Sequence, residues 1–181
     1  LPAGLWYDEA DNLSQARQIL ADPGSIPVFV RSTALPSLFL MPIAAMIDLT
    51  GITPATGRLI SVAFGLAGIV AVFLLVRLLG GPFLGLVAAF LTTVMRWDII
   101  WSRIGMHGIT ATLFAALTAY LTLRAMRSGR LSDFGFAGAS LGLGMWFYTS
   151  FRLFPLVVGV LLLHYLVFQR PEIRRFSVKV L

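Results

Sequence analysis

The distribution of charged residues constrains this chain more than any other feature. Four long stretches, residues 59–76, 104–123, 134–151 and 153–169, contain no Asp, Glu, Lys or Arg. A helix on the surface of a soluble domain carries polar residues along its length at a period of 3.6. A helix that crosses a bilayer needs about 20 apolar residues. With 58% hydrophobic and 12% charged residues, the chain is predicted to be an all-α, polytopic transmembrane helix bundle.

We expect a single transmembrane domain over residues 1–181. Residues 1–58 form a first outer loop with interfacial helices, residues 59–169 form the membrane spans, and residues 170–181 form a cytoplasmic loop and the start of a further segment. The chain begins without Met and ends as an apolar stretch starts, so we expect a fragment of a longer protein.

Two loops are basic, residues 124–130 and 169–175, and the positive-inside rule places both in the cytoplasm. Five spans then follow from the apolar stretches: 59–79, 83–101, 108–126, 134–151 and 153–169. The net charge of +6 lies in short loops, which favours anionic membrane lipid, and no nucleic acid, as a partner. Everything before Arg58, and the turns near Arg103 and Arg152, should therefore face the outside.

Residues 34–50 are apolar, but they contain Pro36, Pro42 and Asp48 and are short for a span. We interpret them as an interfacial or re-entrant helix. A sixth span is the alternative, and it would move the N-terminal residues to the other side of the membrane.

The N-terminal segment predicts a helix from Asp8 to Ala21 that stops at residues 22–24, with Leu13, Ala16 and Leu20 on one face. Asp8 is interpreted as the N-cap, with Glu9 favoured by the helix dipole. A second interpretation makes Asp8 a catalytic base at the membrane surface. The two are compatible, because a capping carboxylate is also held in place.

Arg58, Arg103 and Arg152 lie on the predicted outer face, with Arg31 as a fourth arginine in the first loop. Arginines at span ends often only reach into the headgroup layer. Three arginines on the outer face, where the positive-inside rule disfavours them, also suggest a ligand. Guanidinium groups bind phosphate through paired hydrogen bonds.

Other polar residues are less informative. His107 is a candidate contact for substrate or metal, and Asp98 is expected to pair with a neighbouring arginine. The sequence contains no metal-ligand spacing or phosphate-binding glycine loop, so the metal stays undefined and a divalent cation is left open.

The order of these motifs resembles a known family. An acidic pair in the first outer loop is followed by Gly57-Arg58-Leu59-Ile60-Ser61, a Gly-Gly hairpin, Ser102-Arg103, and a turn over residues 148–155. This order resembles the N-terminal half of the GT-C fold membrane glycosyltransferases that use polyprenyl-phosphate sugars. The most similar group is the family 39 protein mannosyltransferase-like group, which includes the aminoarabinose transferases.

The resemblance implies an inverting transferase in a bacterial or archaeal plasma membrane. Its donor would be a polyprenyl-phosphate-linked sugar, and its acceptor, a protein, lipid or glycan, is undefined. Asp8 would be the general base and Glu9 would organise the site. The donor phosphate would bind among the arginines, and His107 and Tyr148 would contact the acceptor or a metal.

The chain departs from the family pattern at two places. Residues 31–36 stand where many relatives carry a Pro-Pro-Leu element, often after a Lys or His that Arg31 would replace. Residues 105–107 occupy the stretch where some relatives place an aspartate. Two other functions stay open: a transporter or flippase for a lipid-linked or anionic substrate, and a non-catalytic membrane scaffold.

Overall fold

The computed structural model describes residues 4–22, 24, 29 and 36–168 of the 181. Within these residues, helices are the only regular elements apart from an isolated bridge between Phe29 and Pro36. The predicted all-α bundle is confirmed.

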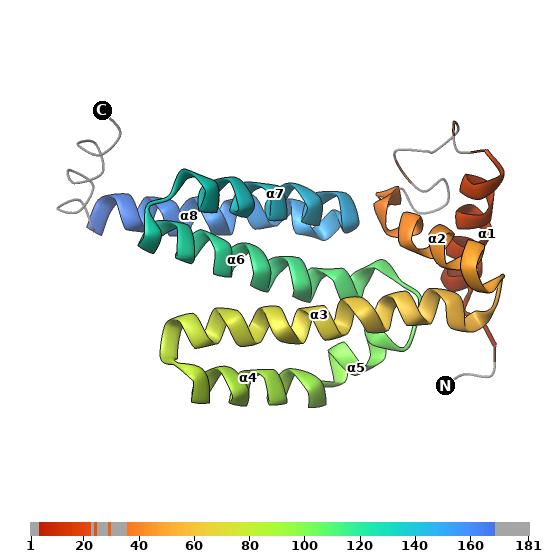
Figure 1. Cartoon of the computed structure of the whole chain (residues 1–181), viewed down its shortest axis with the longest axis horizontal. Coiled ribbons are helices and arrows are strands. Elements are labelled where there is room, and N and C mark those ends of the chain that lie inside the picture. Colours follow the sequence, from red (N-terminus) through yellow and green to blue (C-terminus); the bar gives the residue numbers. More distant parts are fainter. Residues whose placement is uncertain (1–3, 23, 25–28, 30–35, 169–181) are drawn as a thin grey trace.

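Five helices lie side by side and form the bundle (Figure 1). They are α3 (Pro54–Gly80), α4 (Pro82–Val94), α6 (Thr110–Ser128), α7 (Leu131–Phe147) and α8 (Phe154–Phe168). Gly81 and Gly129 make the turns after α3 and α6 with φ values of 88° and 67°. Side chains with a Cβ rarely adopt such positive angles, so glycine suits both turns.

Three helices are long and apolar enough to cross a membrane: Pro54–Gly80, His107–Ser128 and Thr149–Val167. Two of them include a 3-10 turn, η3 (His107–Ile109) before α6 and η4 (Thr149–Leu153) before α8. A bent pair of helices would make a fourth span. α7 has 17 residues and is not in this set, so five spans stay a prediction. The chain is an integral, multi-pass membrane protein.

The span expected over residues 83–101 is not one continuous helix. α4 ends at Val94, and α5 (Arg96–Ser102) continues at an angle of 60°. Thr92 and Thr93 donate hydrogen bonds to carbonyls of their own helix, an arrangement that bends helices. The break lies at Met95, directly before Arg96 and Asp98, the two charged residues of the expected span.

The interfacial segment predicted at 34–50 forms η2 (Ser37–Phe39) and α2 (Leu40–Thr50). With 11 residues, α2 is roughly 16 Å long and is therefore too short to cross a hydrocarbon core of about 30 Å. Its length supports the interfacial interpretation over a sixth span.

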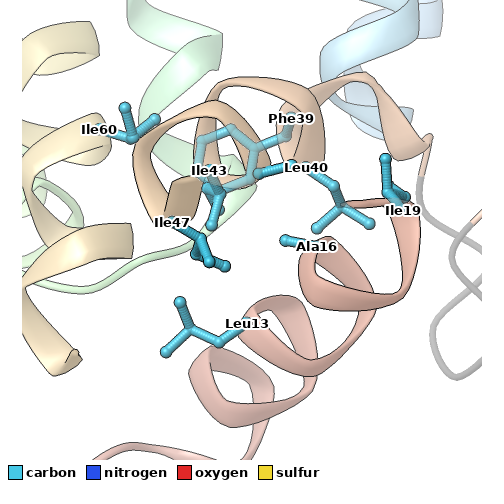
Figure 2. Packing of buried hydrophobic residues seen from close by; sticks show 9 residues of the cluster. Leu13, Ala16, Ile19, Phe39, Leu40, Ile43, Ile47 and Ile60 are labelled. Carbon is cyan, nitrogen blue, oxygen red and sulfur yellow. The ribbon is translucent and has the colours of Figure 1, made fainter. Parts of the chain in front are cut away.

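α1 (Tyr7–Ala21) confirms the predicted N-terminal helix, which ends at Asp22. α1 and α2 lie at one end of the bundle, where α1 runs across the direction of the long helices (Figure 1). Leu13, Ala16 and Ile19 of α1 pack against Phe39 of η2 and the apolar face of α2 (Figure 2). Leu20, expected on this face, is 39% exposed, because the packed face passes through Ile19.

The two ends of the bundle differ as the topology predicts. α1, α2, the start of α3 and η3 gather at one end (Figure 1). The α3–α4 and α6–α7 turns lie at the other end, where Arg127 donates a hydrogen bond to the Leu78 carbonyl. Segments assigned to one side of the membrane therefore do lie together.

Two threonines of α6 give a matched test of the bundle packing. The Thr118 hydroxyl hydrogen-bonds Ser140 of α7 at 2.9 Å, whereas the buried Thr122 hydroxyl has no hydrogen-bond partner among the described residues. Thr118→Val should lower the free energy of unfolding by about 0.6 kcal/mol, a common value for such bonds in membranes. Thr122→Val should leave it equal or higher, because an unsatisfied buried hydroxyl is costly. Unfolding in detergent measures both, and equal losses would contradict the assignment.

Candidate functional site

The Glu9 side chain joins three parts of the chain. Its carboxylate accepts hydrogen bonds from Arg58 Nε at 2.9 Å, Arg58 Nη2 at 3.0 Å, the Gly105 amide at 2.9 Å and the Trp6 amide at 3.1 Å. The residue is only 2% exposed. Glu9 therefore fixes α1 against α3 and against the loop that follows α5.

The start of α1 explains why a glutamate occupies this position. The N-cap is Trp6, so the prediction that Asp8 caps the helix is wrong. Glu9 is the third helical residue and reaches back to the Trp6 amide, as the acidic residue of a capping box does. The same carboxylate is then in place to bind Arg58.

Gly105 allows the loop to approach Glu9. A Cβ atom added to Gly105 would lie 3.2 Å from the backbone carbonyl carbon of Gly57 in α3, so a side chain there would push the two backbones apart, whereas one at Gly57 would make ordinary contact. Asn12, one turn along α1, donates a hydrogen bond to the Gly105 carbonyl at 2.9 Å. The Gly105 carbonyl thus accepts a hydrogen bond from α1, and the Gly105 amide donates one to the same helix.

Burial raises the pKa of Glu9, but hydrogen bonds from Arg58, Gly105 and Trp6, together with the charge of Arg58, outweigh that effect. The net result is a pKa below the usual glutamate value. Glu9 is therefore ionised at neutral pH and acts as the fixed partner of Arg58.

Arg58 is largely occupied by the protein. Besides its two bonds to Glu9, Nη2 donates to the Gly4 carbonyl at 3.0 Å. Arg103 differs, because its side chain is exposed and has no hydrogen bond or ion pair among the described residues. Of the two arginines, Arg103 is the one free to bind an anion.

Arg58 and Arg103 line the same cavity, of about 750 Å³, between the start of α3 and the end of α5. A second cavity, of about 230 Å³, lies between α3, the end of α4 and α5. The two share Val62 and Ser102 in their walls. We call the two together the α3 groove, with an outer part that carries the arginines and a deeper part beyond Ser102.

One stripe of α3 forms the wall of this groove. Arg58, Val62, Gly65 and Ile69 recur at intervals of three or four residues, so they lie on one helix face. From Pro54 to Ile69 the stripe extends roughly 22 Å at about 1.5 Å per residue. Most of it is apolar, and the cationic groups lie at its outer end.

Asp8 follows Tyr7 at the start of α1 and is half-buried. In the part of the chain that the structure describes, its carboxylate has no hydrogen bond or ion pair. Asp8 precedes Glu9 in the chain, and Glu9 forms the ion pair with Arg58.

Neither cavity is lined by the other described residues predicted for the site, which are Asp8, Glu9, His107, Tyr148 and Arg152. The Arg152 guanidinium, in η4, lies 5.2 Å from the centre of the Phe29 ring, and Tyr148 follows the last residue of α7. His107 is 3% exposed, its ring lies 4.6 Å from that of Phe39, and its Nε2 has no hydrogen-bond partner among the described residues. Arg31 lies outside the described residues.

No group of three or more His, Asp or Glu side chains in the described ranges could hold a metal ion. The metal and acceptor contacts suggested for His107 and Tyr148 therefore stay predictions.

The place of Asp98 in the groove was not predicted from the sequence. Asp98 is 9% exposed, lines the deeper part of the α3 groove, and accepts a hydrogen bond from Thr112 of α6 at 3.0 Å. The expected pairing with a neighbouring arginine is absent from the described residues. The signal was present in the sequence, since a carboxylate within an apolar span is expensive and commonly functional.

Fold and groove together define a multi-pass membrane protein with a mostly apolar groove that carries cations at one end. The chain belongs to the dolichyl-phosphate-mannose-protein mannosyltransferase family, whose model matches residues 36–181. It is accordingly a membrane glycosyltransferase by family, as the motif order predicted. No curated protein and no solved structure matches it.

The family match divides the predicted site. Arg58, Arg103, His107, Tyr148 and Arg152 lie within the matched residues, whereas Asp8, Glu9 and Arg31 precede them. The roles of the acidic pair therefore depend on the geometry at α1 and on the resemblance of the first loop.

Removing the Glu9 carboxylate should destabilise the protein far more than removing its neighbour. Glu9→Ala leaves Arg58 without its partner in a mostly buried place and should cost roughly 3–5 kcal/mol in unfolding free energy. Asp8→Asn should change stability little, because no contact of Asp8 is lost. Thermal unfolding in detergent compares the two, and similar midpoints for both variants would contradict the central position of Glu9.

The pH dependence of stability follows from the lowered pKa of Glu9. Its stabilising contribution is fully present above the unfolded glutamate pKa of about 4.3 and is lost as the pH falls through the lower folded value. Wild type should therefore lose stability on acidification below about pH 4 more steeply than Glu9→Gln, which has no such group to protonate. Parallel slopes for the two proteins would count against the shift.

Proposed function

We propose that the protein transfers a sugar from a polyprenyl-phosphate donor to an acceptor at the extracytoplasmic face of the membrane, with inversion at the anomeric carbon. The observation that carries this proposal is the α3 groove, with a mostly apolar wall along α3 and with Arg58 and Arg103 at its outer end. A polyprenyl phosphate has the same order of chemistry, an anion attached to a long apolar chain.

The two arginines have different parts in this proposal. Arg103 is free to form paired hydrogen bonds to the donor phosphate. Arg58, held by Glu9 in a fixed orientation, adds donors that need no rearrangement when the phosphate leaves. A preorganised contact of this kind contributes about 3 kcal/mol to stabilisation of the transition state. Arg31 and Arg152 are further candidates for the same phosphate, on the strength of the resemblance alone.

Asp8 is the proposed general base. It has no partner in the described residues, so its carboxylate is free to take a proton from the acceptor hydroxyl. The adjacent Glu9 anchors α1 to α3 and to the Gly105 loop, which limits how far Asp8 can move. Attack by the deprotonated acceptor opposite the leaving phosphate inverts the anomeric carbon.

The face of the membrane is argued from charge. The end of the bundle opposite to α1 carries the basic turn around Arg124, Arg127 and Arg130, and such turns stay in the cytoplasm. The acidic pair and the outer part of the groove would then face the other compartment.

A transporter is the rival proposal, and one observation favours it. The break between α4 and α5 is a feature that transporters share at their binding sites. The family match and the free carboxylate of Asp8 favour transfer, since transport requires no base.

Asp8→Asn should reduce sugar transfer by roughly 10² to 10⁴-fold, the usual contribution of a general base. Asp11→Asn is the matched control, because it removes a carboxylate from the same helix. That carboxylate accepts a hydrogen bond from Gln15 at 2.6 Å. Transfer of label from a radiolabelled polyprenyl-phosphate sugar is measured with full-length protein in membranes, at equal expression.

Full transfer by Asp8→Asn would overturn the role of Asp8 as base. Donor binding by wild type without any transfer, in the presence of a broad set of acceptors, would overturn the transferase and support transport.

A further inference from the structure

The deeper part of the α3 groove contains polar side chains in an otherwise apolar wall. Thr92, Thr93, Asp98 and Ser102 line this cavity of about 230 Å³ together with aliphatic residues of α3. One water needs roughly 10–15 Å³ of such a cavity, so the space admits a larger group. A plain isoprenoid chain would gain nothing from these oxygen atoms.

The hydroxyl groups in this cavity are already committed as donors. Thr92 donates to the Ala88 carbonyl at 2.9 Å, Thr93 to the Phe90 carbonyl at 2.6 Å, and Ser102 to the Ile99 carbonyl at 3.1 Å. Each hydroxyl has one proton to donate and two lone pairs. Toward the cavity, these side chains are therefore hydrogen-bond acceptors.

Asp98 adds the strongest acceptor. Its Oδ1 accepts from Thr112 at 3.0 Å, and its Oδ2 has no hydrogen-bond partner within the described ranges. The residue is 9% exposed, and Oδ2 is not one of the fully buried polar atoms without a partner, so it remains accessible from the cavity that Asp98 lines. A ligand that donates hydrogen bonds would satisfy it, whereas a hydrocarbon would not.

The groove thus presents two chemistries in sequence. Its outer part offers guanidinium donors from Arg58 and Arg103, and its deeper part offers acceptors around Asp98, with Val62 and Ser102 common to both. A glycosyl phosphate has the complementary order, an anion bonded to a ring that carries hydroxyl groups. The isoprenoid chain on the other side of the phosphate would then lie against the apolar residues of the outer part, Pro54, Ala55, Leu59 and Val62.

We infer that Asp98 is a specificity residue, which accepts hydrogen bonds from hydroxyl groups of the donor sugar while the phosphate binds at Arg103. This inference rests on the proposed function. The deeper part of the groove then distinguishes the sugar-bearing lipid from the sugar-free polyprenyl phosphate that remains after transfer.

The test compares binding of polyprenyl-phosphate mannose, polyprenyl-phosphate glucose and sugar-free polyprenyl phosphate to the full-length protein in detergent. Wild type should bind at least one sugar-bearing lipid more tightly than the sugar-free one. Asp98→Asn should weaken that binding by about tenfold, a modest loss for a hydrogen bond to a charged group. It should leave affinity for the sugar-free lipid unchanged.

Thr112→Val is the matched control, because it removes the internal partner of Asp98 and keeps the carboxylate. It should retain the preference for sugar, and so should Asp98→Glu, which keeps the charge. Arg103→Gln should weaken all three lipids, while exposed Arg17→Gln on α1 should weaken none.

Several results would overturn the inference while leaving the proposed function intact. The first is that Asp98→Asn weakens binding of all three lipids equally. The second is that Thr112→Val weakens binding of the sugar-bearing lipid as much as Asp98→Asn does. The third is that wild type binds the sugar-bearing lipids no more tightly than the sugar-free one. If wild type binds none of the three lipids, the proposed function itself fails and the inference fails with it.

Discussion

The ion pair between Glu9 and Arg58 is the interaction on which the outer end of the molecule depends. Two unit charges are almost removed from water at that point. Among the described residues, each is satisfied by the other and by backbone groups of Trp6, Gly4 and Gly105. A buried pair of this kind adds little net stability but is costly to break. Its effect is therefore geometric, because α1, α3 and the Gly105 loop can occupy one arrangement only.

That arrangement determines which charges remain available to a ligand. Glu9 neutralises Arg58, so the positive charge in the outer part of the groove comes chiefly from Arg103. Asp8, one residue before Glu9, keeps a free carboxylate at the start of the same helix. In the proposed transfer Arg103 binds the leaving anion and Asp8 takes up the proton, and Asp8 would have to act from outside the lining of both cavities.

Local signals in the sequence were sufficient for most helices but not for the contacts between them. The stop at residues 22–24 located the end of α1, and the charge-free stretches located α3, α6 and α8. The partners of Glu9 in α3 and in the Gly105 loop lie 49 and 96 residues away, so nothing near Glu9 in sequence could reveal them. Trp6 as the N-cap was missed for a different reason: the capping interaction comes from the Glu9 side chain and the Trp6 amide, and the identity of residue 6 has no part in it.

The break at Met95 connects the fold to the groove. α4 packs closely on α3 at Gly85, where an added Cβ would lie 3.0 Å from the Phe73 carbonyl oxygen. α5 meets α3 again at Ser102, whose Cβ would be 3.3 Å from one added to Gly65. Between these two contacts the chain bends by 60°, and the deeper cavity lies along α3 beside the bend. If α4 and α5 formed one straight helix, Asp98 would lie further along the axis of α4. The break therefore both opens the cavity and brings a carboxylate to its wall.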